Sequence, residues 1–172
     1  MSAENAPLSA ESLAAIDIEI AKYPRGKQAS AVMSALRIAQ KEKGWLAKET
    51  IAFVAEYLNI PAIRAYEVAT FYNMYDTKPV GRRKLCVCTN LPCALMGAMK
   101  TKAALEEALG IKCGETTEDG EWTLKEGECF GACGDGPVVI VNNEKMHAKI
   151  TAANTADFLA KLQTSDDNKN AG

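Results

Sequence analysis

The sequence predicts an α+β protein, with an N-terminal helical bundle followed by an α/β domain. Residues 9–75 carry apolar side chains at the three- and four-residue spacing of amphipathic helices. Residues 76–83 are polar and include Pro79 and Gly81, which is typical of a linker between domains. Residues 84–162 mix short alternating stretches, typical of strands, with helical ones. We therefore expect two domains joined by this linker.

The composition is that of an ordinary globular protein and excludes several functional classes. The 172 residues are 48% hydrophobic and 24% charged, and the net charge of −2 leaves no basic field to attract nucleic acid. No apolar run approaches the roughly 18 residues of a membrane span, and no signal or transit peptide is visible. Six cysteines in a chain without an export signal favour metal binding over disulfides. Residues 1–8 are expected to form a flexible lead, and residues 163–172 a disordered tail.

Four amphipathic helices are predicted in the first domain, and local signals mark their ends. Ser9 can cap the first helix, Gly44 can close the second, and Pro61 suits the first turn of the fourth. The expected helices cover residues 9–23, 27–43, 48–58 and 61–74. Four such helices make a compact helical bundle.

The fourth predicted helix is rich in large apolar and aromatic residues. Its spacing predicts an inner side made of Ile63, Tyr66, Thr70, Phe71 and Met74. The aromatic residues of this region are Tyr66, Phe71, Tyr72 and Tyr75. They are more aromatic surface than one short helix needs for a core, and aromatic residues are enriched at interfaces. We therefore expect part of this group to contact a partner.

The second domain is predicted to contain strands, two helices and a hairpin. The expected strands are residues 84–88, 111–113, 122–128, 138–141 and 145–148, and the expected helices are 94–109 and 151–162. Gly110 closes the first of these helices, and Asn142-Asn143 provides the turn of the hairpin.

Four cysteines in two pairs are the candidate metal ligands. Cys88 and Cys93 are separated by four residues, and Cys129 and Cys133 by three. Each pair falls in a loop just after a predicted strand, which is where an α/β sheet places its ligands. Glycines in such loops let backbone N–H groups approach sulfur closely.

The spacing of the cysteines favours an iron–sulfur cluster without excluding other roles. Structural zinc most often takes pairs separated by two residues, although gaps of up to four occur. A four-residue gap also occurs in plant-type 2Fe–2S ferredoxins. His147 is the single histidine, which nearly excludes zinc sites of the Cys/His type. The alternatives to a 2Fe–2S cluster are zinc bound by cysteines alone, disulfides, and plain buried thiols.

Five segments of the sequence resemble a known family. They are YEVATFY (66–72), VCTNLPCA (87–94), GETT (114–117), ECFGACG (128–134) and PVV (137–139). These segments are similar to those of the 24-kDa-type subunit of NADH:quinone oxidoreductase, which is the E subunit of bacterial respiratory complex I. The resemblance extends over about residues 10–162. One departure is Phe130, where leucine is the commoner residue of the family.

The resemblance implies a thioredoxin-like second domain that binds one 2Fe–2S cluster. The implied cofactor-binding and metal-ligating residues are Cys88, Cys93, Cys129 and Cys133. No catalytic residue or substrate site is implied. The cluster instead exchanges single electrons with the FMN of a partner subunit that binds NADH.

The resemblance also implies partners and a location. The partners are the flavin- and NADH-binding subunit and a larger iron–sulfur subunit, without nucleic acid and without membrane insertion. The implied location is the cytoplasmic face of the bacterial inner membrane, as part of the complex. The same module occurs in NAD-linked hydrogenases and formate dehydrogenases, which remain the alternative parent complexes.

Other residues near the ligands have less specific roles. Cys86 and Cys113 fall outside the ligand pattern and are expected to be small buried hydrophobes. Glu126, Glu128 and Asp135 lie within a few residues of ligands. Negative charge at these positions would disfavour the addition of an electron, unless the three side chains are simply solvated.

Two further functional classes remain open on the sequence. One is a zinc-stabilised structural module, and the other is a thiol–disulfide enzyme, although the chain contains no Cys-x-x-Cys pair. The sequence shows no Gly-x-Gly-x-x-Gly fingerprint, so the isolated chain is not expected to oxidise NADH. His147, in a polar hairpin, is expected to be a surface residue.

Overall fold

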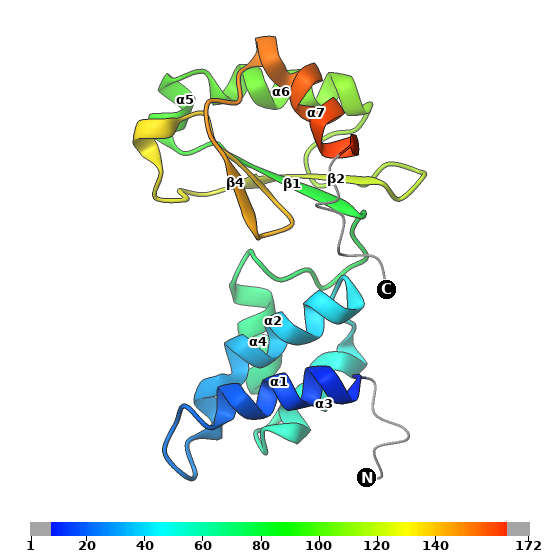
Figure 1. The fold of residues 1–172 in the computed structure, drawn as a ribbon, viewed down its shortest axis with the longest axis vertical. Helices are drawn as coiled ribbons and strands as arrows, with labels where there is room; N and C mark the ends of the chain where they lie inside the picture. Colours follow the sequence, from blue (N-terminus) through cyan, green and yellow to red (C-terminus); the bar gives the residue numbers. More distant parts are fainter. Residues whose placement is uncertain (1–7, 165–172) are drawn as a thin grey trace. The chain divides into compact units, whose positions relative to one another are not determined.

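The computed structural model describes residues 8–164, which divide into two compact units between Pro79 and Val80 (Figure 1). The predicted flexible lead and disordered tail lie mostly outside the described residues. Residues 8, 163 and 164 belong to these predicted segments but are ordered. Leu8 is buried in the helical core, and residues 163 and 164 continue the last helix.

The first unit consists of helices whose ends follow the local sequence signals. The helices are α1 (Ala10–Ile20), α2 (Val32–Lys43), α3 (Lys48–Tyr57) and α4 (Ala62–Phe71), with a 3-10 turn (Gln28–Ala31) before α2. The Ser9 hydroxyl accepts a hydrogen bond from the backbone N–H of Ser12 at 3.2 Å, which caps α1. Gly44 ends α2 with φ at 78°, a conformation that glycine adopts without strain.

The inward side of α4 differs from the one that the sequence predicted. Ala65 and Ala69 are fully buried, whereas Ile63 is 60% and Phe71 is 80% exposed. Alanine lets neighbouring helices approach closely, so the small residues of α4 face the core and its large residues face outward. The predicted inner side of this helix was therefore wrong.

The predicted fourth helix also ends earlier than expected, at Phe71. Tyr72 is extended, with φ −88° and ψ 123°, and the chain then turns Tyr75 back into the core. The Tyr75 hydroxyl donates a hydrogen bond to the carbonyl oxygen of Met33 at 2.8 Å. Tyr75 is thus a core residue, while Tyr66 and Tyr72 remain partly exposed.

The second unit is built on a four-stranded mixed sheet. Its strands are β1 (Arg83–Cys88), β2 (Trp122–Gly127), β3 (Val139–Val141) and β4 (Lys145–His147), in the order β2-β1-β3-β4. β1 runs parallel to β2 and antiparallel to β3. Asn142 and Asn143, both at positive φ, make the predicted turn from β3 into β4. Residues 111–113 are not a strand, contrary to the prediction, and a single bridge joins Thr116 to Thr123.

Three helices lie on one face of this sheet (Figure 1). They are α5 (Leu91–Leu95), α6 (Ala98–Leu109) and α7 (Thr155–Thr164), the last preceded by a 3-10 turn (Ala152–Asn154). Leu105 of α6 and Phe158 of α7 pack with Leu85 and Val87 of β1 in the core. The single helix predicted over residues 94–109 is interrupted because Gly97, at φ 99°, turns the chain between α5 and α6.

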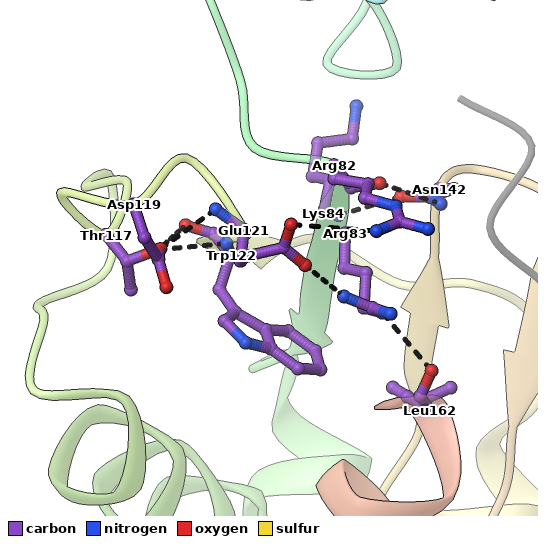
Figure 2. Close-up of polar contacts among 9 residues, drawn as sticks. All are labelled: Arg82, Arg83, Lys84, Thr117, Asp119, Glu121, Trp122, Asn142 and Leu162. Atoms are coloured by element: carbon purple, nitrogen blue, oxygen red, sulfur yellow. Dashed lines mark hydrogen bonds and ion pairs between the residues drawn. The ribbon is translucent and has the colours of Figure 1, made fainter. Parts of the chain in front are cut away.

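A buried arginine fastens the beginning of β1 to its surroundings (Figure 2). Arg83 pairs with Glu121, and its Nε donates to the carbonyl oxygen of Leu162 at 3.2 Å. Its guanidinium carbon also lies 5.1 Å from the centre of the Trp122 ring. Arg83 was expected in the linker, but it is the first residue of β1 and is buried.

Within residues 8–164, no helix is both long enough and apolar enough to cross a membrane.

Candidate metal centre

Parallel pairing of β1 with β2 brings the two cysteine-bearing loops to one edge of the sheet. Cys88 is the last residue of β1, and Cys129 follows two residues after the end of β2. The backbone N–H of Thr89 donates to the carbonyl oxygen of Gly127 at 3.1 Å. The Asn90 side-chain amide donates to Glu128 Oε2 at 3.2 Å. These two hydrogen bonds join the loops beside the cysteines.

The first pair of thiols is buried. Cys88 and Cys93 are each 2% exposed and pack in a small cluster with Ala98 and Val138. The backbone N–H of Cys88 donates to the carbonyl oxygen of Val138 at 3.0 Å, which fixes the end of β1. Burial, together with a hydrogen bond to the Cys88 thiol, raises the pKa of Cys93.

The second pair of thiols is exposed. The Sγ atoms of Cys129 and Cys133 are 3.9 Å apart. Gly131, at φ 75°, directs its backbone N–H to Cys129 Sγ at 3.3 Å. The neighbouring Cys129 thiol raises the pKa of Cys133, with a smaller contribution from Cys88.

The two pairs approach one another at Gly136. A Cβ atom on Gly136 would lie 3.3 Å from Cys93 Sγ and 3.6 Å from the carbonyl oxygen of Cys133. It would also lie 3.0 Å from Sδ of Met96. The absence of a side chain at Gly136 therefore allows both loops to come close. The sequence did not indicate that Met96 would lie at this place.

Four thiols in two adjacent pairs are enough donors for a metal centre. In the part of the chain that the structure describes, no three His, Cys, Asp or Glu side chains are already arranged around one point. Structural zinc needs four ligands around one ion. A 2Fe–2S cluster instead takes two ligands on each iron, and four thiolates are its usual donor set. Two adjacent pairs of thiols fit that requirement.

The other two cysteines occupy different surroundings. Cys113 packs against the core of the sheet, and burial raises its pKa to about 11. Cys86 lies beside Gly127, where an added Cβ would be 2.8 Å from its Sγ and 2.4 Å from the Phe130 ring. Both cysteines are half-buried, so the expectation that they are small buried hydrophobes holds only in part.

Two of the three acidic residues singled out near the thiols, Glu126 and Glu128, are engaged with other groups. Glu126 pairs with Lys102 of α6, and Glu128 accepts the hydrogen bond from Asn90.

The expected surface position of His147 was wrong, because its ring is half-buried and lies 5.1 Å from the Phe158 ring in an edge-on contact.

A family model, described as thioredoxin-like [2Fe-2S] ferredoxin, matches residues 16–163. The chain belongs to this family. The matched region contains all four candidate ligands and nearly all of the described residues. Membership in this family implies an iron–sulfur cluster, for which Cys thiolates are the usual ligands.

Relatives of the chain have similar length and share two fifths or more of the aligned residues. One, from Rickettsia conorii, is named as the E subunit of NADH-quinone oxidoreductase and is 43% identical over 84% of this chain and 86% of its own length. Another, from Rhizobium meliloti, is named as E subunit 2 of NADH-quinone oxidoreductase and is 40% identical over 88% of each chain. The resemblance to the family of the 24-kDa-type subunit is thereby confirmed.

A solved structure supports the fold class. The chain is similar to part of a NAD+-reducing [NiFe]-hydrogenase, with a TM-score of 0.68 and 20% sequence identity. The similarity covers 82% of this chain and 24% of that longer chain. The predicted α+β class, with helices followed by a thioredoxin-like ferredoxin unit, is confirmed.

Proposed function

We propose that this chain is an electron-transfer subunit of an NADH:quinone oxidoreductase and carries one 2Fe–2S cluster. The ligands would be Cys88, Cys93, Cys129 and Cys133. The electron partner would be the FMN of the NADH-binding subunit, and the chain would also contact a larger iron–sulfur subunit. The observation that carries the proposal is the meeting of two thiol pairs at one edge of the sheet.

The surroundings of the four thiols suit a centre that gains and loses single electrons while its ligands stay in place. A 2Fe–2S cluster supplies one-electron transfer when it is bound. The buried pair, Cys88 and Cys93, excludes water on one side, while Cys129 and Cys133 face solvent on the other. The Gly131 N–H donates to a ligand sulfur and so stabilises negative charge there. Binding of the centre would displace the thiol protons.

The outward face of α4 is the candidate attachment surface for a permanent partner. Ile63, Phe71 and Tyr72 are exposed there, and a groove of about 490 Å³ is lined by Glu67, Val68, Thr70, Phe71 and Tyr72. Large exposed apolar groups at one place are typical of protein–protein contacts. We assign this surface to the flavin-containing subunit, which would hold the chain on the cytoplasmic side of the bacterial inner membrane.

The parent complex has an alternative. The fold is shared with part of a NAD+-reducing hydrogenase, and the same subunit could serve an NAD-linked hydrogenase or formate dehydrogenase. The relatives named as E subunits of NADH-quinone oxidoreductase are 40–43% identical over most of the chain, against 20% for the hydrogenase. This difference favours the quinone-linked complex.

The test is the visible absorption spectrum of the purified full chain, prepared anaerobically, with metal and sulfide analysis. We expect about two irons and two sulfides per chain and negligible zinc. The same preparation, free of flavin, should not consume NADH with an artificial acceptor. A colourless protein with one zinc would replace the proposal by a zinc-stabilised structural module, and steady NADH turnover would also contradict it.

A further inference from the structure

Met96 lies beside the buried pair of thiols, although it is not among the proposed ligands. Its backbone N–H donates to the carbonyl oxygens of Pro92 at 3.2 Å and Cys93 at 3.1 Å. The last turn of α5 therefore holds Met96 against the segment that carries Cys93. From this position Met96 Sδ reaches the Gly136 backbone, where Cys93 Sγ also lies.

The large apolar residues near Met96 in the sequence differ in exposure or in position. Leu91 and Leu95, on the same short helix, are 69% and 81% exposed, whereas Met96 is 48% exposed. A Cβ atom built on Gly136 would lie 3.0 Å from Met96 Sδ and 3.3 Å from Cys93 Sγ, so the two sulfur atoms lie on the same side of Gly136. Met99, at the beginning of α6, has a similar exposure of 50%, but its side chain is not among the nearest neighbours of Gly136.

A large apolar side chain in this position affects the reduction potential by keeping water away from the cluster site. Methionine sulfur is polarizable, donates no hydrogen bond and accepts only weakly. Adding an electron to a cluster makes its site more negative, and water near the thiolates stabilises that charge. The reduction potentials of iron–sulfur clusters depend on solvent exposure and on hydrogen bonds to sulfur. A group that keeps water away disfavours the reduced state.

We propose that Met96 is a positioning residue of the cluster site, which packs over Cys93, excludes water from its thiolate and thereby lowers the reduction potential. The inference rests on the proposed function, because it requires a cluster held by Cys93. Met96 is outside the proposed ligand set, and truncation of its side chain should raise the reduction potential.

The first experiment is a redox titration of the full chain followed by electron paramagnetic resonance. At a fixed applied potential, Met96→Ala should raise the ratio of reduced to oxidised cluster about threefold or more. Met96→Leu, which keeps an apolar side chain of similar size, should stay near the unmodified protein. Met99→Ala is the matched control and should leave the ratio unchanged. An unchanged ratio in Met96→Ala, or an equal shift in Met96→Leu, would overturn the inference.

The second experiment needs no cluster. In the metal-free full chain, the alkylation rate of Cys93 can be followed residue by residue with mass spectrometry. Met96→Ala should raise that rate about tenfold, because thiol reactivity depends on access as well as on thiolate fraction, and Met99→Ala should not change it. A chain that binds no cluster overturns the proposed function together with this inference. If the cluster forms but Met96→Ala leaves either the potential or the Cys93 rate unchanged, this inference alone is overturned.

Discussion

At the scale of single residues, six cysteines have three different environments. Cys88 and Cys93 are buried together, Cys129 and Cys133 are exposed together, and the remaining two are half-buried beside the sheet core or Phe130. Residue type alone cannot distinguish these roles, but the surroundings can.

Serine substitutions should separate the ligands from the other cysteines. Replacing Cys88, Cys93, Cys129 or Cys133 by serine should abolish or strongly weaken cluster binding, because a hydroxyl is a poor replacement for a thiolate ligand. Cys86→Ser and Cys113→Ser should keep the cluster and cost about 1–3 kcal/mol of stability, where a buried hydroxyl lacks a partner. Iron and sulfide per chain are the measurement. Loss of the cluster in Cys86→Ser, with retention in Cys88→Ser, would reverse the assignment.

Gly127 should tolerate no side chain, because the Phe130 ring and Cys86 occupy the space. Gly127→Ala should cost about 1–3 kcal/mol through overpacking. Gly134→Ala is the matched control, since no atom lies within 4 Å of its Cβ position. The measurement is the urea midpoint of Trp122 fluorescence in a Trp45→Phe background. The double variant Gly127→Ala with Phe130→Leu should recover part of the lost stability. An unchanged midpoint in Gly127→Ala would contradict the packing argument.

At the scale of elements, one side chain joins β1, β2 and α7 (Figure 2). Arg83 is 5% exposed and contacts Glu121, Trp122 and the carbonyl oxygen of Leu162. Arg83→Met should lower the stability of the second unit by about 1–3 kcal/mol, because the Leu162 carbonyl loses its side-chain donor and Glu121 loses the nearer of its two arginines. Arg82→Met is the control, since Arg82 is 39% exposed and 3.7 Å from Glu121. Equal urea midpoints for the two variants would show that Arg83 does not fasten these elements.

The contact between the beginning of α1 and the end of α2 should depend on pH. Burial tends to raise the pKa of Glu42, but hydrogen bonds from Ser12 and Ser9 and the nearby Lys43 outweigh it and lower the pKa to about 2. Since the ordinary value is 4.5, the stabilisation is complete above about pH 4.5 and is lost as the pH falls through about 2. Between about pH 6 and pH 2, the unmodified first unit should lose about 1–2 kcal/mol more than Glu42→Gln, after allowance for solvent screening. Trp45 fluorescence in a Trp122→Phe background measures this, and parallel pH profiles would contradict it.

Several elements could be predicted because their signals are local. The Ser9 cap, the Gly44 terminus and the Asn142-Asn143 turn each depend on residues next to one another. The orientation of α4 could not be predicted in this way, since its small Ala65 and its large Ile63 are both apolar. The spacing of hydrophobic residues does not say which of them a neighbouring helix will contact.

The candidate site shows the same limit. The two cysteine pairs were visible in the sequence, because each pair is local and follows a strand. The approach of Met96 and Cys93 to Gly136 was not visible, because it depends on how the loops after β1 and β2 meet. Likewise, Gly97 was read as part of a continuous helix, although its positive φ separates α5 from α6.

At the scale of the whole molecule, the described residues form two units with separate cores. The core of the first unit is formed by residues of α1 to α4, and that of the second by the sheet with α6 and α7. All four candidate ligands belong to the second unit, and the outward aromatic face of α4 belongs to the first. This separation fits the proposal that the second unit holds the redox centre and the first unit attaches the chain to its partner.

Removing residues 1–79 tests this division of labour. The shortened chain keeps every proposed ligand and the whole sheet, so it should retain the visible spectrum of the cluster. It should no longer co-purify with the flavin-containing subunit, because permanent contacts are often above roughly 2,000 Å² and the apolar face of α4 would be lost. Phe71→Ser in the full chain is the companion variant: it changes an 80% exposed residue and should weaken co-purification while leaving the fold and spectrum intact. If the shortened chain co-purified at full strength, the second unit would carry the interface by itself. The exposed aromatic groups of α4 would then have to serve another contact, and Phe71→Ser should in that case leave the complex unchanged.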